Sequence, residues 1–182
     1  MYGKKIKILL LALTSVIMIN NTVYSKELKL SDYYFIDSKD DVEPSGLCIR
    51  EGKIYFISDN SDKKVYNINI NGKNCSAGIA AEMEIPKKKE KNKINFEGIT
   101  CDQNGNFYII GEKSLSVVLL NKKGEVKVTK SFKKEAKQED MFQKKGEGPE
   151  GICVNDKGEF IIASQNDYGK LMTANIVNNK IK

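Results

Sequence analysis

Acidic and amide side chains recur at matching places in three similar stretches of this sequence. Each stretch opens with a Ser-Gly or Glu-Gly pair and closes with an acidic or amide residue about fifteen positions later. Oxygen donors of this kind suit a hard cation such as Ca²⁺. We therefore predict a Ca²⁺ site formed by five residues of these stretches, namely Asp59, Glu97, Glu112, Glu150 and Gln165.

The absence of histidine limits the other chemistry that the chain can perform. With no histidine in the sequence, a Ser-His-Asp triad, a Cys-His dyad and a His-ligated zinc are all excluded. The four cysteines, Cys48, Cys75, Cys101 and Cys153, lack CxxC spacing and allow three disulfide pairings, which stay open. We interpret Cys48, Cys101 and Cys153 as small core residues and expect Cys75 on an outer, more exposed strand.

The elements that must position these residues are three repeated hairpins. Gly46, Gly98 and Gly151 anchor the segments 45–60, 97–113 and 150–166, and are 52 and 53 residues apart. Each segment reads as two short apolar strands around a Gly-containing turn. Four strands repeated in roughly 50 residues are typical of a propeller blade. The sequence therefore predicts an all-β fold, a β-propeller of four-stranded antiparallel blades that is incomplete, with about three blades in this chain.

The remaining strands of the blades follow the hairpins. We expect third strands at 64–70, 115–120 and 171–177, fourth strands at 76–85 and 125–132, and an N-terminal strand at 27–36 that could complete the last blade. Closed propellers have about 4–8 blades. Three blades therefore leave two explanations, a truncated copy of a longer product, which we favour, or a homodimer that completes a six-bladed ring.

The expected hairpin register brings carboxylates together. A two-residue turn at Asn104-Gly105 would place Glu97 opposite Glu112, and the same construction would place Glu150 opposite Gln165. Opposed like charges are destabilising, so a shared proton, a bound cation or Lys113 must offset them. The alternative interpretation is that these side chains cap loop N–H groups and bind nothing.

The first 25 residues are interpreted as a signal peptide. Three lysines precede a 12-residue apolar run, Ile8 to Ile19, and Val23-Tyr24-Ser25 offers a cleavage site. The run is shorter than the ~20 residues that span a membrane, so we expect no stable span after cleavage and an exported product, in the periplasm, cell envelope or medium. The propeller would occupy residues 26–182. Removal of the lysines lowers the formal net charge from +6 to +3, which is too weak to indicate nucleic acid.

Two lysine-rich stretches interrupt the repeats, at 87–93 and 133–145. We interpret both as solvated connecting loops, the second with a helical turn. The alternative is an anion-attracting rim above the channel.

The runs SGLCI, IYFISDN, NFEGITCD and GPEGICV resemble the blade signatures of SdiA-regulated and esterase-like phytase propellers. This resemblance covers most of the mature chain, except that Ser45 stands where the other units have Glu. It implies an exported propeller with Ca²⁺ near the channel. We accordingly expect a module that binds a small anionic ligand or an envelope partner. The alternatives are a Ca²⁺-dependent phosphoesterase that works without histidine and, from Gly148-Pro149-Glu150, a lactonase-like hydrolase.

Overall fold

The computed structural model describes residues 34–83, 94–144, 146–165, 170–177 and 180–181. The predicted signal peptide at 1–25 and the lysine-rich stretch at 87–93 lie outside these residues. The chain divides after Tyr33 into two units, and all the described strands belong to the second, Tyr34–Lys182. No described helix is long and apolar enough to cross a membrane.

The first sheet is an antiparallel four-stranded blade with one short strand added to its outer edge. Its order is β1-β5-β4-β3-β2, and its strands are β1 (Ile36–Asp37), β2 (Pro44–Arg50), β3 (Lys53–Ser58), β4 (Ser61–Asn71) and β5 (Asn74–Glu82). The N-terminal strand was expected to complete the last blade. Its described end, β1, instead pairs in parallel with β5 of the first sheet.

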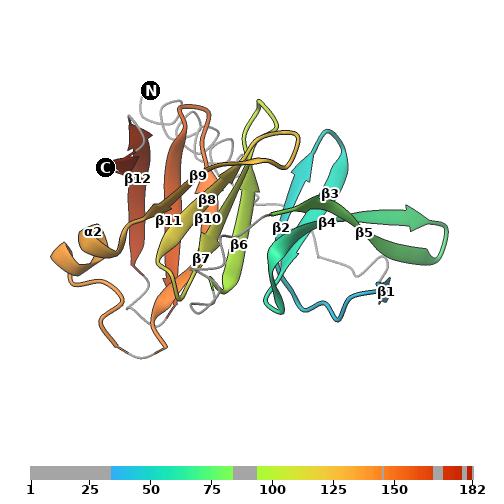
Figure 1. The fold of residues 1–182 in the computed structure, drawn as a ribbon, viewed down its shortest axis with the longest axis horizontal. Coiled ribbons are helices and arrows are strands. Elements are labelled where there is room, and N and C mark those ends of the chain that lie inside the picture. Colours follow the sequence, from blue (N-terminus) through green and yellow to red (C-terminus); the bar gives the residue numbers. More distant parts are fainter. Residues whose placement is uncertain (1–33, 84–93, 145, 166–169, 178–179, 182) are drawn as a thin grey trace, which may run out of the picture. The chain divides into compact units, whose positions relative to one another are not determined.

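The second and third sheets repeat the same up-and-down order (Figure 1). The second contains β6 (Phe96–Cys101), β7 (Phe107–Gly111), β8 (Ser116–Leu120) and β9 (Val126–Ser131). The third contains β10 (Gly148–Val154), β11 (Glu159–Gln165), β12 (Leu171–Val177) and β13 (Lys180–Ile181). Three successive four-stranded antiparallel blades confirm the predicted all-β, incomplete propeller.

The middle sheet is packed on both faces because its strands are continuous apolar runs. Successive side chains of a strand point to opposite faces. Ile109 accordingly joins a core with Tyr55 and Val65 of the first sheet, while Ile110 joins a core with Phe160 of the third. The three sheets therefore pack face to face in sequence order, each pair joined by its own apolar core.

The second lysine-rich stretch is not a wholly solvated loop. It contains the short helix α2 (Lys133–Gln138), whose Ala136 is buried together with Phe132 and Met141 against the second and third sheets. The helix thus presents apolar side chains inward and its lysines to solvent, which agrees with the predicted helical turn and corrects the expectation of a fully solvated segment.

Candidate functional site

Each inner hairpin contains a β-bulge at the same position of the repeat. The ladder register shifts between Pro44 and Gly46, between Phe96 and Gly98, and between Pro149 and Gly151. The extra residues are Ser45, Glu97 and Glu150. A bulge leaves its residue outside the ladder and re-aims its side chain, so these three side chains leave the regular alternation of their strands.

The predicted carboxylate pairs are wrong as ladder pairs, for two reasons. The second hairpin turns through Asp102–Asn106 with Gly105 at φ +81°, because the Asp102 carboxylate accepts the Asn106 N–H at 2.9 Å. The bulge then removes Glu97 from the ladder, so that Phe96 pairs with Gly111. By the same mechanism Gln165 lies opposite Gly148, and Glu150 has no ladder partner. The two-residue turn occurs only in the first hairpin, where Arg50 pairs with Lys53.

The glycines after the first two bulges, Gly46 and Gly98, bring neighbouring blades into backbone contact. A Cβ built on Gly98 would lie 2.9 Å from the Glu150 carbonyl oxygen and 3.0 Å from the Ile152 nitrogen. A Cβ on Gly46 would lie 2.9 Å from the Ile99 nitrogen and 3.2 Å from the Glu97 carbonyl oxygen. Only glycine permits this approach. The bulge of one blade therefore lies against the inner strand of the blade before it.

Asn95 connects the carboxylates that the ladder does not pair. Its Nδ2 donates to Glu97 Oε1 and, at 3.0 Å, to Glu112 Oε2, and its Oδ1 accepts from Lys113 Nζ at 3.1 Å. One amide donor therefore stands between two carboxylates, where a cation would also be stabilised. The sequence pattern did not point to Asn95, and only a proton, a cation or Lys113 was expected in this role.

The backbone around Asn95 holds this amide in place. Asn95 has φ +59°, a left-handed conformation that asparagine tolerates better than most residues. The Asp62 carboxylate accepts the N–H groups of Ile94 and Asn95 at 2.9 and 2.7 Å, and the Glu112 N–H donates to the Asn95 carbonyl at 2.9 Å. The sequence did contain one indication of this role. Asn95 lies two positions before the Glu97-Gly98 pair, and asparagine is one of the residues that adopt a left-handed backbone where a strand changes direction.

The electrostatics show that four of the five predicted ligands lie close enough to interact. Partial burial, and then the charges of Glu150, Asp59 and Glu112, raise the pKa of Glu97 from 4.5 to about 7. Burial also raises the pKa of Glu150, followed by the charge of Glu112, while a hydrogen bond from Glu97 opposes this rise. Near neutral pH the Glu97 carboxyl is therefore partly protonated, which lowers its repulsion with the neighbouring carboxylates.

The other predicted ligands, Glu112, Asp59 and Gln165, lie at different places around the bulges. The Glu112 side chain lies directly over Gly148, so that any side chain at 148 would collide with it, and it therefore reaches toward the third blade. Asp59 follows β3, and its N–H donates to the Glu43 carbonyl at 3.0 Å. Ser45, at the first bulge, donates to the Phe96 carbonyl at 2.8 Å. Gln165 is exposed on β11.

The donor set fits a hard cation, although within the described part of the chain no three His, Cys, Asp or Glu side chains meet in the geometry of metal ligands. The available donors are carboxylate and amide oxygens, which Ca²⁺ prefers. In this structure the NH₂ group of the Asn95 side chain donates to both Glu97 and Glu112, and so takes the place that a cation would have between them. Rotation of that amide would exchange its N–H for an oxygen ligand.

The cysteines are free thiols throughout. Cys48 and Cys101 lie partly buried against the core between the first two sheets. Cys75 is buried, whereas Cys153 is exposed, which reverses the two expected environments. Cys75 is buried although it lies on the outer strand β5, and the strand position alone therefore did not determine its exposure.

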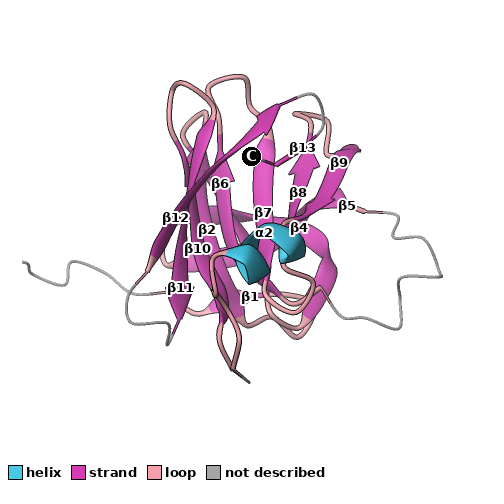
Figure 2. Ribbon diagram, turned by 90° about the vertical axis from the view of Figure 1, so that its left-hand side faces the viewer, coloured by secondary structure: helices cyan, strands magenta, loops and turns pink. Residues whose placement is uncertain are grey.

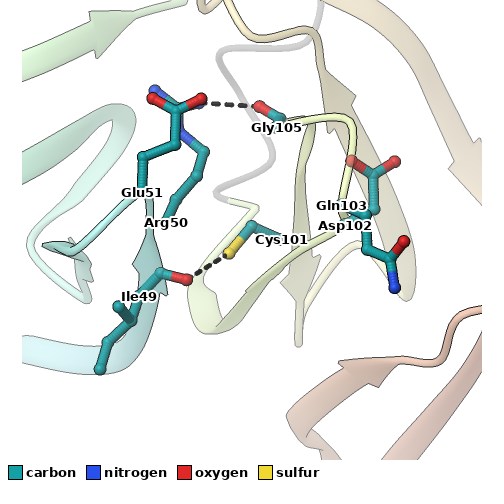
Figure 3. Close-up of a pocket in the computed structure, with 7 residues that line it drawn as sticks. All are labelled: Ile49, Arg50, Glu51, Cys101, Asp102, Gln103 and Gly105. Carbon is teal, nitrogen blue, oxygen red and sulfur yellow. Dashed lines mark hydrogen bonds between the residues drawn. The ribbon is translucent and has the colours of Figure 1, made fainter.

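A hollow lies at the end of β2 and β6 that is opposite to the bulges (Figure 3). It has a volume of about 310 Å³ and is lined by Ile49, Arg50, Glu51, Cys101, Asp102, Gln103 and Gly105. Arg50 donates to the Gly105 carbonyl at 2.8 Å, and its guanidinium lies 4.2 Å from the Phe107 ring centroid. These contacts fasten the first blade to the second. We therefore assign Arg50 a structural role.

The chain is similar to one family model and to several solved structures. A family model described as "Phytase-like: Esterase-like activity of phytase" matches residues 44–175. No curated protein matches the chain. Among solved structures, the chain is similar to a luciferin-regenerating enzyme at 14% identity and a TM-score of 0.46, over 70% of this chain and 40% of that one.

Two further solved structures are similar over comparable lengths. Virginiamycin B lyase from Staphylococcus aureus is 17% identical with a TM-score of 0.45, over 78% of this chain and 44% of that one. Regucalcin, a calcium-binding protein from Agrobacterium tumefaciens str. C58, is 13% identical with a TM-score of 0.45, over 69% and 39%. This chain thus spans about two fifths of the length of these structures.

Proposed function

Because this chain belongs to the phytase-like family, we propose that it is a binding module whose acidic site holds Ca²⁺ and, with it, a small anionic ligand. The observation that carries the proposal is that Glu97 and Glu112 share one amide donor, Asn95 Nδ2, while Glu150 of the adjacent blade lies close enough to interact with both. Such a concentration of like charge is costly in the folded protein. A bound cation would remove this cost.

The residues that would hold Ca²⁺ are Glu97, Glu112 and Glu150, with Asp59 adding negative charge nearby. Ca²⁺ supplies a positive centre that an anion can contact. The protein contributes the rigid frame, since Asp62 and the Glu112 N–H fix the Asn95 backbone. Lys113, which bonds Asn95, adds a positive charge at the edge of the site for the anion.

Isothermal titration of the full chain with Ca²⁺ tests this proposal. We expect binding with a dissociation constant of about 10⁻⁵ to 10⁻³ M. Glu97→Gln should weaken it strongly, while the control Glu125→Gln, an exposed residue paired with Lys127 on the second sheet, should leave it unchanged. Absence of any Ca²⁺ binding by the folded protein would refute the proposal.

Proton release gives a second readout from the same titration. At pH 6 Glu97 is mostly protonated, because its pKa is about 7. Since a carboxylate must be ionised to bind a metal, Ca²⁺ should release about one proton at pH 6 and almost none at pH 8.5. The comparison of buffers with different ionisation enthalpies measures this number. A release that does not depend on pH would place the cation away from Glu97.

A second candidate function is Ca²⁺-dependent hydrolysis of phosphoric esters. The family description favours it, and so does the position of Lys113 beside the acidic site, where it could contact a phosphate. Turnover of p-nitrophenyl phosphate that requires Ca²⁺ and is lost in Glu97→Gln would establish catalysis. Binding without turnover of phosphate esters or lactones would leave the binding function alone.

We also propose that the protein is exported, on the basis of the charged and apolar pattern of residues 1–25. Cleavage after Ser25 would release a chain that begins at Lys26. N-terminal sequencing of protein recovered outside the cytoplasm tests this cleavage. A full-length chain that stays in the cytoplasm would contradict it.

A further inference from the structure

The inner strands of the first two blades lie side by side and run in the same direction. A Cβ built on Gly46 of β2 would lie 2.9 Å from the Ile99 nitrogen of β6. Further along both strands, the Cys101 thiol donates to the Ile49 carbonyl at 3.1 Å (Figure 3). Because these contacts advance together along β2 and β6, Cys48, which lies between Gly46 and Ile49, is placed beside Cys101.

The side chains of these two cysteines point into the same interface. Cys48 pairs with Tyr55 in the ladder of the first sheet, and Cys101 pairs with Phe107 in that of the second. Directly opposed residues of a ladder point to the same face of their sheet. The Tyr55 and Phe107 rings meet across the interface, with their centroids 5.0 Å apart. Since Cys48 and Cys101 also pack against the core between these sheets, the two thiols face each other.

The other two cysteines lie elsewhere. Cys75 is on β5, which β4 and β3 separate from β2, so it is at least about 14 Å from Cys48 at the usual strand spacing. The Cα atoms of a disulfide are no more than about 7 Å apart. Cys153 lies between Ile152 and Val154, which pack against the core of the second and third sheets, so it points away from the second sheet. It is exposed on the side of the third sheet that Figure 2 views.

We propose that Cys48 and Cys101 form a disulfide that joins the first blade to the second, with a donor disulfide as the oxidant. The sequence allows three pairings of its cysteines, and the geometry favours this bond while Cys75 and Cys153 stay as thiols. In the oxidising compartment to which we propose that the chain is exported, such donors are available. The bond would cross the interface at the end opposite to the bulges, where Arg50 already donates to the Gly105 carbonyl.

The bond forms by two successive exchanges with the donor. Cys101 lines the hollow at this end of the strands and meets the donor first, so that its thiolate attacks one donor sulfur and the other leaves as a thiolate. Cys48 then loses its proton, and its thiolate attacks Cys101 Sγ and releases the second donor thiolate. Two protein thiols are thereby oxidised by two electrons, and one donor disulfide is reduced to two thiols that take up the two protons.

The two thiols differ as nucleophiles. Burial, and then the neighbouring Cys101 thiol, raise the pKa of the Cys48 thiol, while the charge of Arg50 opposes this rise. Because the thiolate is the nucleophile, we expect Cys48 to react slowly with a donor in solution and to act on the mixed disulfide at Cys101, which is held beside it.

The first experiment maps the disulfide of the full chain, with EDTA present so that the outcome does not depend on the proposed Ca²⁺ site. The reduced protein is incubated with oxidised glutathione at pH 8, alkylated in urea, digested and analysed by mass spectrometry. We expect one linked peptide pair, joined through Cys48 and Cys101. A link between any other two cysteines, or no link within the chain, would overturn the proposal.

Stability gives a second readout of the same bond. A disulfide that closes a loop of about 50 residues should raise the midpoint of urea denaturation by about 1 to 2 M over that of the reduced chain. Cys48→Ala and Cys101→Ala should each lose this difference between oxidised and reduced protein. The control Cys153→Ala changes an exposed cysteine and should keep it. Each variant is compared with its own reduced form, so a loss of packing does not affect the result.

Two outcomes of the urea experiment would contradict the proposal. An oxidised parent chain no more stable than the reduced chain would mean that the native geometry does not accommodate the bond. A difference that persists in Cys101→Ala would assign the stabilisation to another pair.

The order of the two exchanges is tested with the same alanine variants. In Cys48→Ala, Cys101 should accumulate a glutathione adduct, because the thiol that would displace it is missing. In Cys101→Ala, burial still raises the pKa of Cys48, and its adduct should form at least about tenfold more slowly. Equal rates at the two positions would overturn the assigned order.

Discussion

The substitution Glu97→Gln should stabilise the Ca²⁺-free protein, and only at neutral or alkaline pH. The folded-state pKa of Glu97 is raised from 4.5 to about 7, whereas the unfolded chain keeps the ordinary value. Between these pH values the folded state binds more protons than the unfolded state, so stability falls as pH rises. Below pH 4.5 both states are protonated and there is no loss, and above about pH 7 the loss is complete.

The size of the effect follows from this difference. At about 1.4 kcal/mol for each pH unit, the full interval would correspond to about 3.4 kcal/mol. Glu97 is only partly buried, and solvent screens its interactions, so we expect about 1 to 2 kcal/mol. Glutamine keeps the shape of the protonated carboxyl group and its ability to donate toward Glu150, but it cannot ionise.

Urea denaturation with EDTA at pH 4.5, 6, 7 and 8 measures the effect. The free energy of unfolding of Glu97→Gln should match that of the parent protein at pH 4.5 and exceed it by about 1 to 2 kcal/mol at pH 8. Glu125→Gln is the control, since the bond to Lys127 lowers the pKa of this exposed carboxyl, and it should give no stabilisation at any pH. A difference for Glu97→Gln that is constant from pH 4.5 to 8 would refute the reasoning.

Three further predictions concern the frame of the site. Gly98→Ala should destabilise the protein by about 1 to 3 kcal/mol, because its Cβ would lie 2.9 Å from the Glu150 carbonyl, and urea denaturation of dilute protein should show no such loss for Gly151→Ala. Asn95→Gly keeps the left-handed backbone but removes the donor to Glu97 and Glu112, and should cost about 1 to 3 kcal/mol at pH 8 and less at pH 4.5. Phe132→Ala removes a fully buried ring and should cost about 3 to 5 kcal/mol, with a matching fall in the urea midpoint.

The blades were predictable because their signals are local. The glycine-anchored repeat and the apolar strands of each hairpin indicate four-stranded units without reference to the rest of the chain. The third strands begin and end close to the predicted residues, as in β12 at Leu171–Val177. Each strand needs only an apolar run and a turn, and both are visible in the sequence.

The partners of individual residues were harder to predict. The position of β1 depends on pairing with β5, a contact between segments almost forty residues apart. Cys75 pairs with Ile70 in a regular hairpin, yet it is buried. Asn95 acts through a left-handed backbone that Asp62 stabilises from another blade. These features depend on contacts between distant segments, which a strand pattern does not contain.

The bulge at Glu97 could nevertheless have been recognised from the spacing of apolar residues. Phe96 and Ile99 are three residues apart and lie in the same core between the first two sheets. A regular strand places residues two or four apart on one face, so both side chains can reach that core only if one extra residue is inserted between them. Gly98 must lie against the next blade, which leaves Glu97 as the residue that departs from the ladder. The acidic side chain is thus directed to the site by the same packing that joins the blades, and a substitution that removes the bulge should displace Glu97 even where its own chemistry is unchanged.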